Sequence, residues 1–419
     1  MSKGKSEFPL QTRRDPYSAL RVSEFRNFIF ARFFLTIASL MQAVIVGWQV
    51  YELTKDPLSL GLVGLAEVIP SIAVSFIAGH IVDTSIRKHV LLFAYSLLLF
   101  CSVSLFFIST DTIVFLTANK VPAIYAAIFI SGIARGFSMP SAFAFWSQLI
   151  PQKIFANAVT WNTSTWQLGA VTGPAIAGFV YAVLGYSLTY LVIGIVILSA
   201  IILISFIKKR PKPEVVEQVS LYSRLTAGAK FVYHNKIILN AITLDLFAVL
   251  FGGATALLPI FSAEILFVGP EGLGMLRAAP SVGALVMAVF LTRHPPAKRA
   301  GKDLLLCVFG FGVSMLVFAV SKNYTLSLAA LAIGGAFDAV SVVIRSTIIQ
   351  LMTPNNMKGR VSAVNSIFVG SSNEIGAFES GVTAKFMGTV ASVIFGGVMT
   401  LVVVFIVWFF SPKLRKLSL

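Results

Sequence analysis

Long apolar runs separated by short polar connections make up most of this chain. Many runs approach about 20 residues, the length that a helix needs to cross the hydrocarbon of a bilayer. Helices are expected because lipid cannot satisfy backbone polar groups, and the short alternating segments of a membrane β-barrel are missing. The pattern predicts about twelve membrane-spanning helices, at residues 27–51, 59–82, 88–109, 122–146, 157–182, 184–207, 237–262, 271–292, 303–321, 325–350, 362–384 and 388–410.

The composition also indicates an all-α membrane protein. The 419 residues are 57% hydrophobic and only 12% charged, with a mean hydropathy of +0.87. Soluble domains carry about 25% charged residues, so a soluble fold is excluded. Cys101 and Cys307 lie inside apolar runs, where we expect free thiols and neither a disulfide framework nor a metal site. Residues 1–26 are polar and lack the pattern of a signal peptide.

Basic residues determine the expected topology. The formal net charge of +16 would suggest a nucleic-acid partner in a soluble protein. Here most lysines and arginines fall in the two tails and the even-numbered connections, as they do in cytoplasmic loops. The opposite side holds Lys55, Lys120, Lys322 and Lys385. We therefore expect both termini in the cytoplasm and no nucleic-acid partner.

The longest connection divides the chain into two sets of six spans. Within it, Leu221–Tyr233 is expected to form an amphipathic helix along the inner membrane surface. A plain solvated linker fits the first half of the connection better. The expected organisation is a cytoplasmic tail (1–26), an N-terminal six-helix half (27–207), a cytoplasmic linker (208–236), a C-terminal six-helix half (237–410) and a cytoplasmic tail (411–419).

The two halves share residues in one register, which indicates an internal repeat. The matched pairs are Gly132 and Gly335, Ser138 and Ser341, Pro151 and Pro354, Asn162 and Asn365, Gly173 and Gly376, and Gly178 and Gly381. Two parallel six-helix halves, each built from inverted triplets, are the layout of one large class of transporters. In that layout the substrate binds near the midplane, between the halves.

The connection between the second and third spans, GHIVDTSIRKHV, carries a recognisable charge pattern. Its Gly79, Asp83, Arg87 and Lys88 resemble the signature of the major facilitator superfamily at this position. Thr84 and Ile86 replace the basic residue and the second glycine that are usual there. The resemblance implies that the motif latches the cytoplasmic ends of the two halves when the transporter faces outward. Asp83 would then lie at the start of the eleventh span, where a helix dipole favours a carboxylate. A basic cytoplasmic loop with one incidental acid is the alternative.

Other segments extend the resemblance to nearly the whole chain. GAVTGPAIAG resembles the exporter motif of the fifth span, and its Gly169, Gly173, Pro174 and Gly178 form an expected hinge. A packing seam is the alternative. Segments such as VGWQVYELTKDPLSLGLVGLAEVIP and GRVSAVNSIFVGSSNEIGAFESG are similar to the branch of enterobactin exporters and macrolide efflux proteins. The resemblance implies a multi-pass protein of the bacterial plasma membrane.

Carboxylates inside the spans are candidates for proton coupling, because they are costly there and face the interior or a cavity. Asp245 is the first choice, since an isolated buried carboxylate takes up a proton more readily than one in water. Its alternative is an ion pair with a base such as Arg32. Glu67, Glu374 and Glu379 are further candidates, and each could instead pair with an arginine.

Three arginines lie inside spans. The family resemblance implies proton transfer or substrate binding for Arg135, and a fixed countercharge is the alternative. Arg277 could meet an anionic substrate, but a pair with Glu264 or Glu271 near the outer face is preferred. Arg345 is expected to make a structural pair with a glutamate of the eleventh span.

Polar and aromatic residues inside spans suit either a large substrate or bonds between helices. The cavity candidates are Gln42, Trp48, Gln49, Asn162, Trp166, Asn365 and Asn373.

The expected function is secondary transport by alternating access, as a proton-driven exporter of a siderophore or an amphipathic drug-like molecule. No nucleotide-binding loop or catalytic constellation stands out, so we expect no enzyme activity and no cofactor beyond the proton gradient. The expected state is a monomer in the bilayer with a small-molecule substrate. Uptake by symport, and a non-transporting sensor or scaffold, remain as alternatives.

Overall fold

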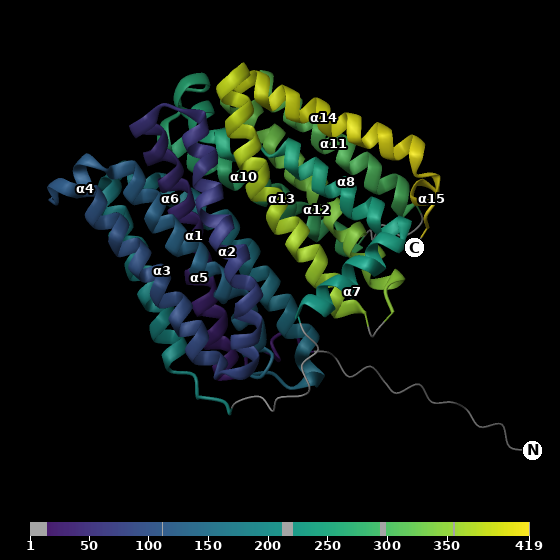
Figure 1. Cartoon of the computed structure of the whole chain (residues 1–419), viewed down its shortest axis with the longest axis horizontal. Helices are drawn as coiled ribbons and strands as arrows, with labels where there is room; N and C mark the ends of the chain where they lie inside the picture. The colour runs from purple at the N-terminus through teal and green to yellow at the C-terminus, as the bar shows by residue number, and fades with distance from the viewer. Residues whose placement is uncertain (1–14, 111, 212–220, 294–298, 355–356, 419) are drawn as a thin grey trace, which may run out of the picture.

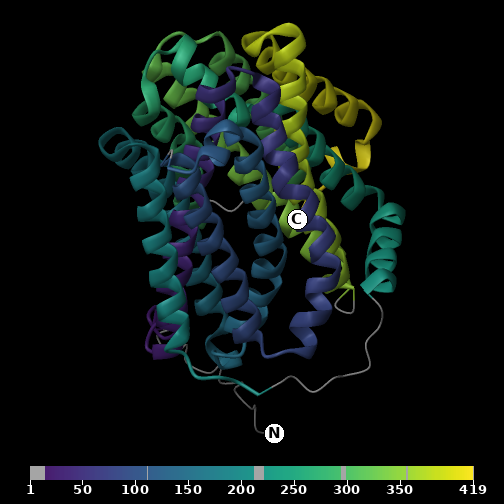
Figure 2. The same ribbon diagram turned by 60° about the vertical axis from the view of Figure 1, so that its left-hand side comes forward.

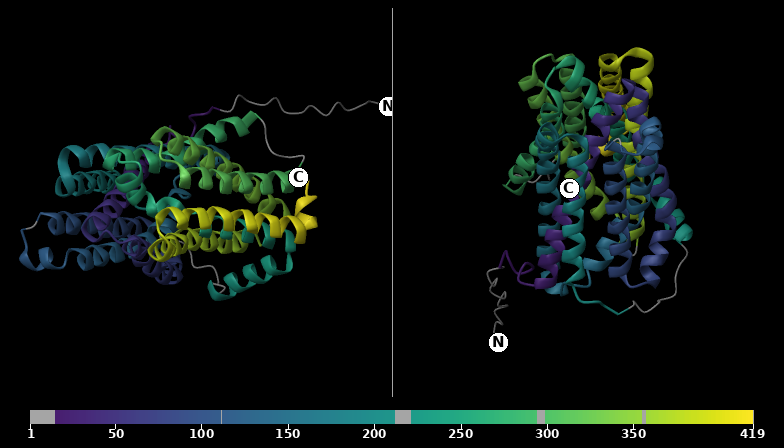
Figure 3. Two further views of the ribbon diagram at one scale, coloured as in Figure 1. Left: turned by 90° about the horizontal axis from the view of Figure 1, so that it is seen from above. Right: turned by 90° about the vertical axis from the view of Figure 1, so that its left-hand side faces the viewer.

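The fold, taken from a computed structural model, consists of two helical bundles that lie side by side (Figure 1). The structure describes residues 15–110, 112–211, 221–293, 299–354 and 357–418. Within these ranges the regular elements are helices. Figure 3 shows that the long helices within each bundle lie roughly side by side.

Among its described residues, the N-terminal half holds six α-helices, of which α4 is short and α6 is very long. Their bounds are α1 Ser23–Thr54, α2 Pro57–Thr84, α3 Arg87–Ser109, α4 Val114–Ala118, α5 Lys120–Trp146, the 3₁₀ turn Gln152–Ile154, and α6 Phe155–Ser205. Asp56 caps α2 by accepting a hydrogen bond from the backbone N–H of Leu58 at 3.3 Å. Gly185 has φ +67°, which is open to glycine, and divides α6 into two spans.

The C-terminal half begins with α7, which lies apart from the main bundle in Figure 2 and packs against the start of α13. The elements are α7 Leu221–His234, α8 Lys236–Gly252, the 3₁₀ turn Ala254–Leu257, α9 Leu258–Ile260, the π-turn Phe261–Ile265, α10 Gly269–Arg293, α11 Ala300–Val320, α12 Tyr324–Met352, α13 Lys358–Met387, α14 Thr389–Phe410 and α15 Pro412–Arg415. Asn235 and Asn323 cap α8 and α12 through their side-chain oxygens.

The span count agrees with twelve. Ten helices of the described chain are long and apolar enough to cross a membrane, and one of them contains the two spans of α6. The remaining span is α13, a helix of 30 residues that carries Asn365, Asn373, Glu374 and Glu379. Its polar residues explain why composition alone does not mark it. A polar helix of this length within the bundle is a place to look for function.

The halves are closed together at the end where α1 joins α2 and α13 joins α14, which we call the junction end. There Lys385 pairs with Asp56 of the other half at 3.4 Å, and the Tyr51 hydroxyl donates to Glu264 across the same boundary. One continuous apolar core also crosses between the halves at this end, from Tyr51 to Phe261 and Phe318. These contacts hold the junction end shut.

The opposite end, where the linker between α6 and α7 lies, is called the linker end. A side chain added at Gly79 on α2 or at Gly359 on α13 would meet nothing within 4 Å. The second apolar core lies here and involves the C-terminal half alone, from Ile238 to Val361 and Leu414. In the described chain, the ion pair and the hydrogen bond that join the two halves both lie at the junction end. The halves are therefore joined at one end and separate at the other.

Candidate functional site

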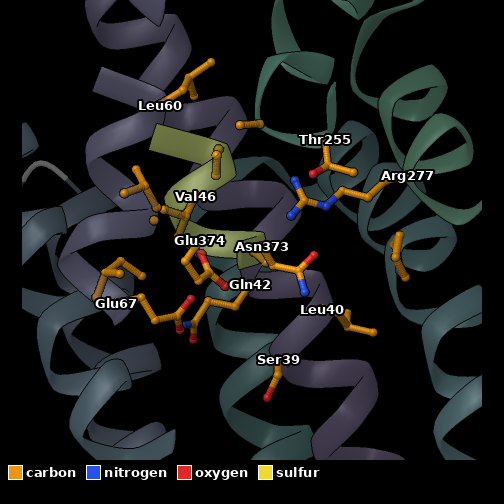
Figure 4. Close-up of a pocket in the computed structure, with 18 of the residues that line it drawn as sticks. Ser39, Leu40, Gln42, Val46, Leu60, Glu67, Thr255, Arg277, Asn373 and Glu374 are labelled. Atoms are coloured by element: carbon orange, nitrogen blue, oxygen red, sulfur yellow. The ribbon is translucent and has the colours of Figure 1, made fainter. Parts of the chain in front are cut away.

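A cavity of about 440 Å³, lined by both polar and apolar residues, lies between the two halves. Figure 4 shows side chains from both halves converging on it, with Glu67, Gln42, Glu374, Asn373 and Arg277 grouped together. Helices α1, α2, α5 and α6 line one side, and the 254–257 turn, α9, α10 and α13 line the other. Apolar residues such as Val46 and Leu60 complete the wall. A cavity of this size and mixed lining suits a drug-sized organic molecule.

The N-terminal half contributes a fixed ion pair. Arg135 Nε on α5 donates to Glu67 Oε1 on α2 at 2.9 Å, and the Ser131 hydroxyl donates to the same oxygen at 3.0 Å. Gly132 lets α5 approach closely, since a Cβ there would lie 2.2 Å from the carbonyl oxygen of Glu67. Two donors on one carboxylate oxygen fix the position of the Glu67 side chain. Arg135 therefore has the countercharge that its alternative interpretation requires.

The C-terminal half contributes two opposite charges that do not pair. Glu374 on α13 and Arg277 on α10 both line the cavity, yet among the described residues neither makes an ion pair within 4 Å or a side-chain hydrogen bond. Gly64 on α2 leaves room for Glu374, because a Cβ there would lie 3.2 Å from Glu374 Oε2. The preferred assignment of Arg277 to an outer-face glutamate is wrong: Glu264 instead accepts from Tyr51. Sequence position alone does not show which way an arginine in a span points.

The cavity candidates divide into two groups. Gln42, Trp166 and Asn373 line the cavity. Gln49 lies outside its lining, where Nε2 donates to Ser109 Oγ at 2.9 Å and Oε1 accepts from the Tyr190 hydroxyl at 2.8 Å.

The other three candidates also lie outside the lining. Trp48 is buried, and Asn162 and Asn365 are half-buried nearer the linker end. The buried Oδ1 atoms of Asn162 and Asn365 have no hydrogen-bond partner in this structure.

Asp245 is not isolated. It lies on α8 and forms a buried ion pair with Arg345 on α12, in place of the alternative partner Arg32. The expectation that Arg345 pairs with a glutamate of α13 is also wrong. Asp338 lines the same small cavity as Asp245. Glu379 is half-buried on α13 and lies outside the lining of the central cavity.

The charged residues of the α2–α3 connection act within the N-terminal half in this conformer. Arg87 donates to the Ala144 carbonyl at 3.0 Å, and Lys88 Nζ donates to the carbonyls of Ser205 and Ile207 at 2.9 and 2.6 Å. These carbonyls lie at helix C-termini, where cations are stabilising. Asp83 is exposed, and the latch to α13 is not formed at the open linker end.

The glycines of the GAVTGPAIAG segment are contact points on α6. A Cβ at Gly169 would lie 2.7 Å from Thr36, and one at Gly173 would lie 3.1 Å from the Ile37 carbonyl, both on α1. Gly178 instead faces α10 of the other half, where a Cβ would lie 2.6 Å from the Pro270 carbonyl. Pro174 lies inside α6, which continues through it. The segment therefore packs α6 against α1 and seals the junction end against α10.

Comparison with known proteins assigns the chain to a family and shows that solved transporter structures share its fold. The model of the transmembrane secretion effector family matches residues 14–418. The chain is 24% identical over 395 residues to the enterobactin exporter EntS of Shigella flexneri, which covers 94% of this chain and 92% of that protein. Identity to the enterobactin exporter EntS of Escherichia coli O1:K1 / APEC is 23% over 393 residues, with the same coverage.

Solved structures share the architecture at low identity. The D-xylose-proton symporter has a TM-score of 0.74 at 15% identity, covering 96% of this chain and 100% of that chain. A bacterial homologue of the human lysosomal transporter Spinster, in an inward-facing and unoccupied conformation, has a TM-score of 0.74 at 12% identity, covering 95% and 98%. With the family match over nearly all of its length, the chain belongs to the transmembrane secretion effector family of transporters, within the major facilitator superfamily.

Proposed function

We propose that this protein exports a siderophore or an amphipathic drug-like molecule in exchange for protons, by alternating access. The observation that carries the proposal is the charged cavity between the halves, which is sealed at the junction end. Membrane carboxylates and arginines in a cavity mark substrate and proton paths. Relatives named as enterobactin exporters cover 94% of the chain and support export.

The proposed orientation places the junction end outside and the linker end in the cytoplasm of a bacterium, together with both termini. The basic residues of the linker-end connections support this orientation. The conformer described here would then face the cytoplasm, ready to receive substrate. Release would require the junction end to open and the linker end to close.

The test uses inside-out membrane vesicles energised to an acid interior. Enterobactin, carboxylate siderophores, macrolides and ethidium are added in turn, and proton release is followed with a pH-sensitive dye. We expect release with one compound class, lost in vesicles without the protein and in Glu374→Gln, and kept in Asp303→Asn, which lies outside the cavity on α11. Uptake of protons with the substrate would indicate symport and would overturn the proposal.

A further inference from the structure

Two carboxylates and two guanidiniums line the central cavity, and among the described residues Glu374 and Arg277 are the two that make no ion pair within 4 Å. Figure 4 shows Arg277 of α10 reaching toward Glu374 and Asn373 of α13. Both come from the C-terminal half, whereas the charges of the N-terminal half are already neutralised in the Glu67–Arg135 pair. The C-terminal half therefore supplies the charges that are available to a ligand.

Desolvated charges are costly unless a partner satisfies them. In this cavity Glu374 can only accept hydrogen bonds when ionised, and Arg277 can only donate them. A ligand that places a donor at Glu374 and an acceptor at Arg277 satisfies both groups at once. A simple cation is attracted by Glu374 but repelled by Arg277. A simple anion is attracted by Arg277 but repelled by Glu374.

We propose that Glu374 and Arg277 form a two-point receptor that selects substrates with a hydrogen-bond donor beside an acceptor. The adjacent hydroxyl groups of a catechol have this pattern, since one O–H donates while the other oxygen accepts. The receptor excludes lipophilic ions of a single sign. This inference rests on the proposed export function and narrows its substrate class to catechols and similar neutral or zwitterionic molecules.

The same arrangement makes the substrate and a proton compete for Glu374, and antiport requires such competition. A donor binds Glu374 as the carboxylate, so a proton on Glu374 competes with the substrate. The charged groups that face Glu374 are Glu67 on α2, Arg135 on α5 and Arg277 on α10. The facing residues of α1 and the 254–257 turn, Gln42 and Thr255, are neutral. Substrate affinity is therefore expected to rise with pH as Glu374 loses its proton.

The experiment measures equilibrium binding to the purified full chain in lipid nanodiscs, with no gradient. The probes are ethidium as a lipophilic cation, tetraphenylborate as a lipophilic anion, and enterobactin as a catecholate. In Arg277→Gln we expect ethidium affinity to rise about tenfold and enterobactin affinity to fall by about the same factor. In Glu374→Gln we expect tetraphenylborate affinity to rise about tenfold and enterobactin binding to lose its pH dependence.

Two variants serve as controls. Arg277→Lys keeps the charge and is expected to keep excluding ethidium. Arg293→Gln removes an exposed arginine at the end of the same helix and is expected to change none of the affinities. Equal ion affinities in Arg277→Gln, Glu374→Gln and the wild type would overturn the receptor. The binding of ethidium and tetraphenylborate is measured without transport. If the vesicle test of export fails, these binding data still test the receptor.

Discussion

The carboxylate of Asp245 on α8 and the guanidinium of Arg345 on α12 form an ion pair inside the C-terminal half. Each residue is only 4% exposed. Removing one partner of such a pair leaves the other charge buried and uncompensated, which costs about 3–5 kcal/mol. Asp245→Asn is therefore expected to lower the thermal unfolding temperature of the purified protein strongly.

A double variant separates stability from proton coupling at this pair. Asp245→Leu with Arg345→Met replaces both charges by apolar groups and is expected to recover most of the lost stability. Full proton-coupled transport in the double variant, or in Asp245→Asn, would show that Asp245 is structural. Loss of coupling with recovered stability would instead support Asp245 as a proton carrier.

The class of fold could be predicted from the sequence because its signals are local. Lengths of apolar runs set the spans, and GHIVDTSIRKHV and GAVTGPAIAG indicated the superfamily. The polar α13 was also predicted, at residues 362–384, although its composition alone does not mark it as a span. The expected boundary between the fifth and sixth spans, at 182–184, falls beside the break at Gly185.

The ion-pair and hydrogen-bond partners of polar residues inside the spans could not be predicted, because they depend on how each helix is rotated about its axis. Arg277 lies within a span near Pro280, and nothing in the sequence around it distinguishes a cavity-facing side chain from one paired near the outer face. The same limit applies to Asp245, which looks isolated along α8 but meets Arg345 from a helix about 100 residues later. Gln49 resembles Gln42 in sequence context, yet its amide is taken up by Ser109 and Tyr190.

The α6–α10 contact is expected to control opening at the junction end. A Cβ at Gly274 would lie 2.5 Å from the Pro174 carbonyl oxygen. Because this oxygen belongs to the backbone of α6, the helix itself would have to move to make room. Gly274→Ala should push the halves apart at the junction end and shift the population toward closure of the linker end. Spin labels at Ser85 on the α2–α3 connection and Lys358 on α13 would report a shorter distance.

A matched glycine provides the control for that measurement. A Cβ at Gly194 on α6 would lie 3.6 Å from Ser102 Oγ, which is an ordinary contact within one half. Gly194→Ala should leave the distance between the labels unchanged. An unchanged distance in Gly274→Ala as well would mean that the α6–α10 contact does not set the conformer.

The latch is expected to act only in the other conformer. Asp83 is exposed here, so Asp83→Asn should leave the junction-closed conformer unchanged. A carboxylate at a helix N-terminus contributes about 0.3–1 kcal/mol. Its loss should reduce the population with a closed linker end by a factor of about two to five, measured with the same spin labels. Asp303→Asn, which also removes one acid near the linker end, should have no effect, and an equal effect of the two would argue against the latch.

The basic part of the same motif is expected to have a separate, structural role. Lys88 Nζ donates to two carbonyls at the end of α6, and this contact lies within one half, so it persists in both conformers. Lys88→Met should lower the unfolding temperature, by the loss of about 1–3 kcal/mol of charged hydrogen bonds, without changing the label distance. Asp83→Asn should instead change the label distance without lowering the unfolding temperature. If Lys88→Met shifts the conformer and spares stability, Lys88 belongs to the latch after all, and the contacts to Ser205 and Ile207 are incidental to this conformer.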